Sequence, residues 1–265
     1  MGPHTVDWST LRAPADGTLE ATGRRERRKR ATRQMLIDKA IEMFLERGFD
    51  AVTVSEIAEV CDVSPTTVFN HFPTKESLVL DLPDDLLAAL RAALADPAAT
   101  PIEGMVRILA GELDNLTTWL ETQDDKAWAA EAVQRFEVMV QDTPALRAHH
   151  RNMLQQMTDA ACEVLAVRAG LDPRDPEPQI AAAALLGLWS IQVNSSRKYL
   201  DGRRSPEQVR DAVTAEVGRA AHLLETGLAA FAVEAEPDHR ARGAIHGDAA
   251  VRLPGTTFVL FKQAH

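Results

Sequence analysis

Residues 53–78 of the chain read TVSEIAEVCDVSPTTVFNHFPTKESL, and this stretch decides the fold. Thr53 and Glu56 have the spacing of a capping box, in which a hydroxyl and a carboxylate satisfy each other's backbone N–H groups. Ser64 is a favourable N-cap, and Pro65 follows at the first helical position, where its missing N–H costs nothing. The stretch therefore predicts a helix-turn-helix, whose second helix enters the major groove of DNA.

Apolar residues within the stretch define the side of each short helix that we expect to be buried. These residues are Ile57, Ala58 and Cys61 in the first helix and Val68, Phe69 and Phe72 in the second. Pro73 should end the second helix, because the residue before a proline disfavours the helical conformation.

A longer helix is expected before this stretch, over about 32–47. Its apolar residues repeat at helical spacing, and Gly48 follows where a left-handed C′ residue is wanted.

Residues 23–33, just before this helix and within its first turn, have a net charge of +6. The whole chain has −10, so the remainder has −16. A basic arm beside a helix-turn-helix predicts contact with a polyanion, since Lys and Arg release counterions from phosphates. A solvated tail is the alternative for such a run.

Residues from about 30 to 80 resemble the DNA-binding domain of the TetR (tetracycline-repressor-like) family of bacterial regulators. The matching residues are Ala40, Phe44, Gly48, Thr53, Ile57, Ala58, Val63, Ser64, Thr67, His71, Phe72, Lys75, Glu76 and Leu78. The chain departs from the family in the middle of the second short helix, where aromatic hydroxyls are usual and this chain has Phe69 and Asn70. A contact from Phe69 must be apolar or absent, while Asn70 can donate to a phosphate or read adenine.

The expected DNA contacts come from the basic arm, from residues at or near helix N-termini and from the second short helix. The arm reaches along phosphates or into the minor groove, and Thr53 and Lys75 contact phosphates. Thr66 and Thr67 are placed to meet a thymine methyl, while His71 either donates to a phosphate or caps its helix. The full set is Arg24, Arg25, Arg27, Arg28, Lys29, Arg30, Thr53, Pro65, Thr66, Thr67, Phe69, Asn70, His71 and Lys75.

Composition and pattern predict an all-α protein of two domains. The 265 residues are 45% hydrophobic and 26% charged, as in soluble globular proteins. Helical spacing continues through 84–95, 101–120, 128–142, 146–170, 180–199 and 205–231, with a proline-rich loop over 171–178. We expect a disordered segment at 1–22, a helix-turn-helix domain with its basic arm at 23–80, a ligand-binding and dimerisation domain at 81–233, and a disordered tail at 234–265.

Several classes of site are not expected. The two cysteines lie about a hundred residues apart, which suggests neither a disulfide framework nor a metal site. The longest apolar run, 180–193, is too short and too polar to span a bilayer, and residues 1–16 lack a secretory signal. Nucleotide-binding and hydrolase motifs are missing, so we expect a cytoplasmic protein that is not an enzyme and needs no cofactor or metal.

The last two helices predict self-association. The helix over 178–200 is apolar on more than one face, as in a helix between its own domain and a partner. In the resembling family the last two long helices form a four-helix bundle across a two-fold axis, which implies a homodimer through helices near 178–200 and 205–232. Two helix-turn-helix units one helical turn apart would then read a pseudo-palindromic operator on double-stranded DNA.

Large apolar side chains and a few polar ones on several of the middle helices indicate a small-molecule chamber for a hydrophobic or amphipathic inducer. The candidates are Trp119, Trp128, Glu131, Arg135, Phe136, Met139, His150, Met153, Met157, Trp189 and Gln192. Ordinary core packing is the alternative for each of them, and Glu131 and Arg135 have the spacing to pair with each other.

The resemblance implies a repressor that a ligand releases from its operator. Two alternatives stay open: an activator or unspecific DNA binder, and a ligand-binding or protein-interaction module whose DNA-binding fold is idle. The salt dependence and sequence preference of DNA binding distinguish them.

Overall fold

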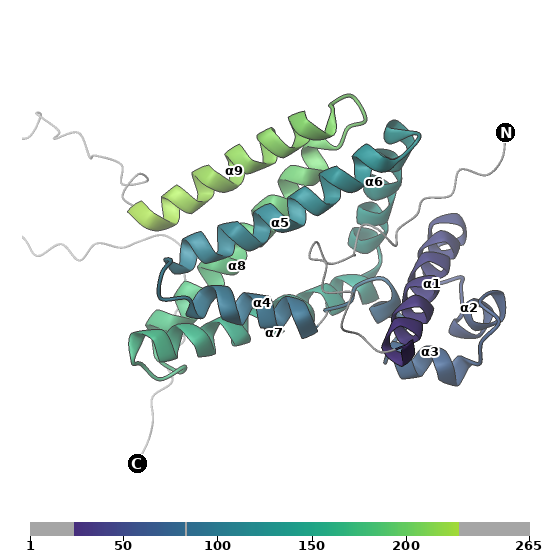
Figure 1. Cartoon of the computed structure of the whole chain (residues 1–265), viewed down its shortest axis with the longest axis horizontal. Coiled ribbons are helices and arrows are strands. Elements are labelled where there is room, and N and C mark those ends of the chain that lie inside the picture. The colour runs from purple at the N-terminus through teal and green to yellow at the C-terminus, as the bar shows by residue number, and fades with distance from the viewer. Residues whose placement is uncertain (1–23, 83, 228–265) are drawn as a thin grey trace, which may run out of the picture. The chain divides into compact units, whose positions relative to one another are not determined.

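The computed structural model describes residues 24–82 and 84–227, with side chains described from Arg27 onward. Within these residues every regular element is a helix, as Figure 1 shows, so the expected all-α fold is confirmed. The segments expected to be disordered, 1–22 and 234–265, lie outside the described residues.

Three helices near the N-terminal end form the helix-turn-helix unit. They are α1 (Arg24–Arg47), α2 (Val54–Val60) and α3 (Pro65–His71). Both short helices begin as expected: Thr53 and Glu56 form the reciprocal capping box, and the Ser64 hydroxyl accepts the N–H of Thr67 at 3.1 Å. Pro65 occupies the first position of α3. Local sequence therefore fixes where each short helix starts.

The start of α1 differs from the expectation. The apolar spacing predicts a helix over about 32–47, but α1 begins at Arg24, so the basic block is its first two turns and not a separate arm. Arg, Lys and Gln have high helix propensity, and no residue of the block interrupts the helix. Gly48 ends α1 with a φ of 85°, the left-handed conformation expected of it.

The short helices pack on α1 through one apolar core, which includes the buried side chains of Phe44, Ile57, Val68 and Phe72. The expectation that Phe69 belongs to this core is wrong, because its side chain is 51% exposed. Successive residues of a helix lie about 100° apart, so a helix that turns Val68 and Phe72 toward α1 turns Phe69 away.

The rest of the described chain is a helical domain whose element order follows the predicted spacing. After the 3-10 turn η2 (Glu76–Leu78) come α4 (Asp84–Ala95), α5 (Pro101–Thr122), α6 (Lys126–Asp142), α7 (Pro144–Ala169), α8 (Pro176–Tyr199) and α9 (Pro206–Thr226). Helix α9 packs on α5 and α8, while α4 packs on α5 and α7. None of these helices combines the length and the apolar character needed to cross a bilayer.

Two boundaries in this domain correct the expectation. Helix α8 begins at Pro176, inside the predicted loop, because the first N–H groups of a helix have no intrahelical acceptor and Pro176 and Pro178 therefore lose nothing there. Helix α9 opens with the predicted capping box of Ser205 and Gln208 but ends at Thr226, not near residue 231.

Glu216 of α9 joins the last two helices. Its carboxylate accepts hydrogen bonds from the Lys198 ammonium and the Tyr199 hydroxyl, both at 2.7 Å, and from the Ser195 hydroxyl. The bond from Lys198, followed by those from Ser195 and Tyr199, lowers the pKa of Glu216 from 4.5 to about 2. A carboxyl group whose pKa is lower in the folded state stabilises that state above its unfolded pKa and loses the contribution as pH falls.

This carboxylate makes stability depend on acidity in a defined window. Glu216→Gln should lower the urea midpoint at pH 6, and the difference from the wild type should shrink as pH falls from about 4.5 toward about 2. Urea unfolding at a series of pH values measures this difference. Glu207→Gln, which changes an exposed residue in the first turn of α9, is the control. A difference in urea midpoint between the wild type and Glu216→Gln that does not change with pH would contradict this role of Glu216.

Candidate nucleic-acid interface

The outer face of α3 carries four exposed side chains: Pro65, Thr66, Phe69 and Asn70. Thr66, Phe69 and Asn70 have the i, i+3, i+4 spacing that places them on one side of a helix. That side is opposite the one on which Val68 is buried in the core. The face is uncharged, apolar at its centre and able to form hydrogen bonds at Asn70, which suits contact with base edges.

Two of the expected contact residues use their hydroxyls inside the helix caps. The Thr53 hydroxyl donates to Glu56 at 2.8 Å, and the Thr67 hydroxyl lies 2.9 Å from the Ser64 hydroxyl. Arg47 binds the other oxygen of Glu56 at 2.7 Å, and this bond, with those from Thr53, lowers the pKa of Glu56 to about 2. Contacts of Thr53 and Thr67 with DNA stay predictions, and their structural role is to fix the two short helices.

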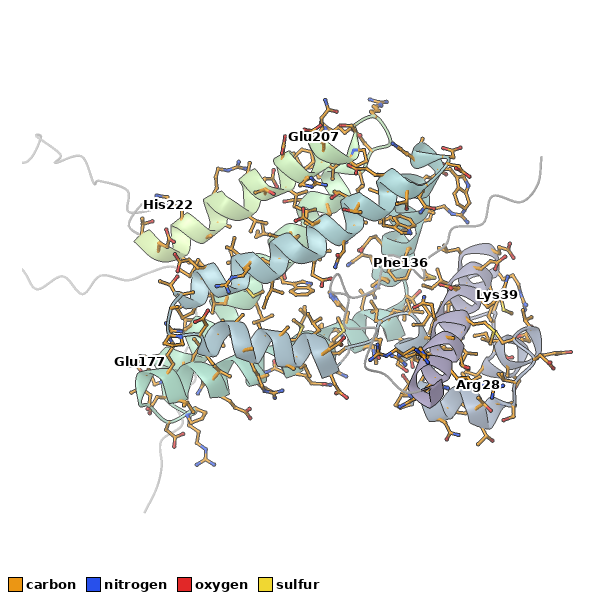
Figure 2. The ribbon with its side chains drawn as sticks, in the orientation of Figure 1. Arg28, Lys39, Phe136, Glu177, Glu207 and His222 are labelled. Carbon is orange, nitrogen blue, oxygen red and sulfur yellow. The ribbon has the colours of Figure 1, made fainter. Side chains whose placement is uncertain are left out.

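Basic side chains of α1 lie near the end of α3. Arg27, Arg28, Lys29 and Arg30 are exposed, and Figure 2 shows Arg28 on the first turns of α1. Lys29 is close enough to His71, the last residue of α3, to lower its pKa. Arg24 and Arg25 belong to the same helix. The arrangement puts a positive surface for phosphates beside the uncharged face of α3.

Arg33 holds this arrangement together, a role that its place in a basic run does not reveal. It donates to the backbone oxygen of His71 at 2.9 Å and to the carboxylate of Asp81. Its guanidinium also lies over the ring of Phe72, 4.1 Å from the centroid. Arg33 therefore ties α1 to the end of α3 and to the segment before α4.

His71 is half-buried, and its Nδ1 atom has no hydrogen-bond partner in the described part of the chain. Burial lowers the pKa of His71, and the positive charges of Arg33 and Lys29 lower it further. Both effects favour the neutral imidazole in the protein without DNA.

Lys75 makes a contact within the protein that the sequence does not indicate. Its ammonium donates to the backbone oxygen of Phe49 at 2.6 Å and lies 4.2 Å from the centroid of the Phe49 ring. The side chain thus fastens the turn before η2 to the loop after α1. Its expected phosphate contact stays a prediction, and it would compete with this internal bond.

The residues expected to form a ligand chamber differ in how deeply they are buried. Trp119, Met157 and Gln192 are buried in the packed interior, where Gln192 donates to the backbone oxygen of Leu109 at 2.9 Å. The half-buried candidates are Trp128 and Phe136 on α6, His150 and Met153 on α7, and Trp189 on α8. Burial lowers the pKa of His150.

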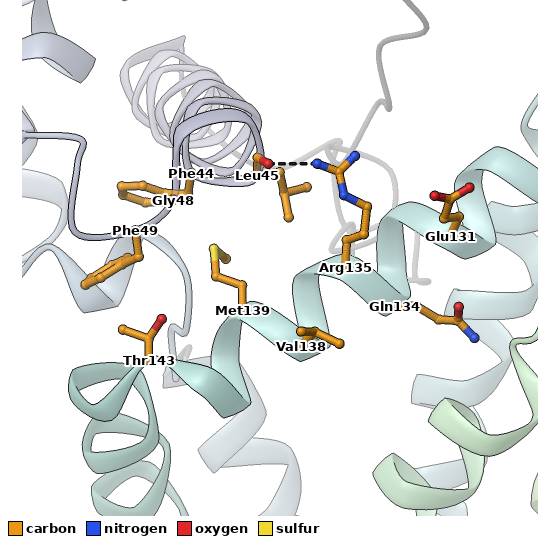
Figure 3. Close-up of a pocket in the computed structure, with 10 residues that line it drawn as sticks. All are labelled: Phe44, Leu45, Gly48, Phe49, Glu131, Gln134, Arg135, Val138, Met139 and Thr143. Carbon is orange, nitrogen blue, oxygen red and sulfur yellow. Dashed lines mark hydrogen bonds between the residues drawn. The ribbon is translucent and has the colours of Figure 1, made fainter.

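Three other candidates, Glu131, Arg135 and Met139, line an open groove of about 580 Å³ between α6 and the end of α1 (Figure 3). Arg135 does not pair with Glu131 within the described residues, and it donates instead to the backbone oxygen of Leu45 at 2.8 Å. The described residues also bring together no group of three His, Cys, Asp or Glu side chains that could hold a metal ion.

Comparison with known proteins gives two family matches. Residues 36–82 match the family described as bacterial regulatory proteins, tetR family, and residues 118–229 match the family described as the MftR C-terminal domain. The first match covers α2, α3 and the second half of α1, and the second begins within α5 and takes in α6 to α9. The first match thus falls on the helix-turn-helix unit and the second on the larger helical domain.

Individual relatives are regulators by name. The chain is 32% identical over 168 residues to the HTH-type transcriptional regulator TcmR of Streptomyces glaucescens, covering 60% of this chain and 69% of that protein. It is 27% identical over 166 residues to the HTH-type transcriptional repressor KstR2 of Rhodococcus jostii, covering 60% and 75%. Among solved structures, NalD of Pseudomonas aeruginosa is similar over 72% of this chain and 97% of that one, with 22% identity and a TM-score of 0.46.

The bridging role of Arg33 can be tested by a change that keeps its charge. Arg33→Lys should lower the free energy of unfolding by about 1–2 kcal/mol, because an ammonium cannot reproduce the guanidinium's planar fork and stacking. Urea denaturation measures the loss, and Arg27→Lys, at an exposed position of the same helix, is the matched control. Equal midpoints for the two variants would show that Arg33 contributes only charge.

Proposed function

The chain belongs to the TetR family of bacterial regulatory proteins, and we propose that it is a transcriptional repressor that a small molecule releases from a pseudo-palindromic operator. It reads DNA as a homodimer, and its role is binding and not catalysis. Since it acts on the chromosome, the cytoplasmic location expected from the sequence is part of this proposal.

The observation that carries the proposal is the outer face of α3 beside the basic turns of α1. Thr66, Phe69 and Asn70 project from a helix whose other side is fixed in the core. Basic side chains nearby supply affinity for phosphates, which does not depend on sequence, whereas the face of α3 supplies discrimination between bases. The separation of the two chemistries on neighbouring surfaces is what a sequence-specific reader requires.

Phe69 and Asn70 have different roles in the recognition of bases. Asn70 forms paired hydrogen bonds with the N6 and N7 atoms of an adenine, a contact worth about 1–3 kcal/mol of discrimination. Phe69 lacks a hydroxyl, so its exposed ring contacts a thymine methyl. The operator half-site accordingly contains an A·T pair opposite this part of α3.

The homodimer forms through the outer faces of α8 and α9. Ile180, Ala183, Gly187 and Ile191 are exposed at spacings of three and four, so they form one stripe along α8. Ile180 is 71% exposed, which is costly for a large apolar side chain that no partner covers. A Cβ added at Gly187 or at Gly218 of α9 meets nothing within 4 Å, so both faces have room for close approach of a second copy.

Release follows from a shift between two conformers of the dimer. In one conformer the two α3 helices match the operator spacing, and in the other they do not. An inducer that binds the second conformer more tightly lowers DNA affinity, at most by the ratio of its affinities for the two conformers. The inducer is hydrophobic or amphipathic, in keeping with the apolar side chains of α5 to α8.

Selection of random duplex DNA on the purified full-length protein at about physiological salt tests the function. Recovery of a pseudo-palindrome with A·T pairs in each half-site supports a dimeric, sequence-specific regulator. Recovery of unpatterned DNA contradicts sequence-specific reading, and recovery of no DNA contradicts the proposal as a whole.

Replacing Asn70 separates base reading from phosphate contact. Asn70→Ala should weaken binding to the selected operator about tenfold or more, while binding to unrelated DNA changes by less than about twofold. Fluorescence anisotropy with both duplexes measures this, and Asn152→Ala, at an exposed position on α7, is the control. Equal losses on both duplexes would make Asn70 a phosphate contact.

The dimer face has a matched pair of test positions. Gly187→Glu should convert the dimer to monomer, because it places a charge and bulk on the stripe of α8 without a clash inside the protomer. Gly111→Glu lies at a position of α5 that is also exposed and also free of contacts at the added Cβ, and it should leave the dimer intact. Light scattering after size-exclusion chromatography distinguishes the states, and a dimeric Gly187→Glu variant would place the interface elsewhere.

A further inference from the structure

The open groove between α6 and the end of α1 lies where the helix-turn-helix unit meets the larger helical domain (Figure 3). We propose that this junction groove is a binding site for a neutral amphipathic small molecule, and that its occupant controls the DNA-binding unit. The first part stands on the groove itself, and the second part rests on the proposed function.

The size and course of the groove suit an elongated molecule. Glu131, Arg135, Val138 and Met139 lie on one side of α6, at i, i+4, i+7 and i+8. From Glu131 to Thr143, which also lines the groove, a helix rises about 18 Å. Its volume of about 580 Å³ falls within the range of about 300–1,000 Å³ that small-molecule sites occupy.

The apolar end of the groove lies between the two domains. Phe44 and Phe49 lie on the α1 side of this end, where both rings are almost wholly buried, and Met139 faces them from α6. Val138 is 53% exposed and is therefore accessible to a ligand in the groove. Leu45, Val138 and Met139 provide the apolar contact for the body of a ligand.

The polar end selects a neutral head group. Glu131 and Arg135 contribute one negative and one positive charge, so neither a free anion nor a free cation is favoured by the lining as a whole. Gln134 donates to the backbone oxygen of Leu200, which leaves its side-chain oxygen as an acceptor. A ligand head with both a donor and an acceptor, such as an amide or a hydroxy-ketone, matches these groups.

Arg135 connects the groove to the DNA-binding unit. Leu45 is among the last four residues of α1, whose carbonyls lack partners within a helix, and Arg135 caps this carbonyl from α6 at 2.8 Å. A ligand acceptor in the groove competes for the same guanidinium. Because Arg33 fixes α1 to the backbone of His71, a shift of α1 against α6 moves α3 with it.

The first experiment asks whether the site exists. Nile red, a neutral solvatochromic dye, is titrated into the full-length protein and its fluorescence followed. Val138→Trp fills the groove and should weaken dye binding about tenfold or more, whereas Val167→Trp, at an 82% exposed position on α7, should change it less than about twofold. Equal affinities for the wild type and both variants would overturn the site.

A second variant distinguishes loss of the site from loss of folding. Val138→Lys adds charge to the groove without aromatic bulk, and it should weaken dye binding while leaving the thermal midpoint within a few degrees of the wild type. Dye binding that falls only together with the thermal midpoint would also overturn the site.

The second experiment asks whether the groove controls DNA. Saturating Nile red should weaken binding of the selected operator by the wild type about tenfold, and by Val138→Trp less than about twofold. If the dye occupies the groove and operator affinity does not change, the site is supported, but the proposal that its occupant controls DNA binding is overturned. If no operator is recovered, the proposed function fails, and the dye titration still decides on the site by itself.

Discussion

Two seven-residue helices are too short to persist in water by themselves, since isolated helices below about 12–15 residues are marginal. The burial of Ile57, Val68 and Phe72 against α1 holds them in place, and each such side chain contributes about 1.5–3 kcal/mol. Because this core fixes one side of α3, it also fixes which residues face outward. The surface that we propose reads DNA is therefore set by which side of α3 packs in the core.

Polar contacts add to the packing of the core in holding the elements together, and several of them are hydrogen bonds to backbone oxygens. Arg33 reaches His71, Lys75 reaches Phe49 and Arg135 reaches Leu45 through main-chain acceptors. Net contributions of about 0.5–1.5 kcal/mol are typical of single hydrogen bonds. Bonds of this size orient one element against another, and a ligand or a nucleic acid can replace them at moderate cost.

The junction between the two domains has this character. Beside the Arg135 bond, Nε2 of His149 on α7 lies 2.9 Å from the backbone oxygen of Leu80, just after η2. These contacts involve helices of the larger domain on one side and the ends of α1 and η2 on the other. The groove lies next to the first of them, so the same few side chains serve both the domain contact and the lining. By contrast, Trp119, Met157 and Gln192 are buried in the core of the larger domain, together with many other side chains.

The sequence by itself determined the features that depend on neighbours along the chain. Capping residues, Gly48 and the periodic apolar positions located nearly every helix, and the motif in 53–78 predicted the helix-turn-helix, because caps and amphipathic spacing are local. It also predicted DNA contacts from Asn70 and the basic residues of α1 by type and spacing. Only the tertiary structure decided that Phe69 faces outward, that Arg33 bridges α1 and α3, that Lys75 is held by Phe49, and that Glu131, Arg135 and Met139 meet α1 at a groove. The reason is physical: those outcomes depend on which surfaces of distant helices meet, and residue spacing within one helix does not specify its neighbours.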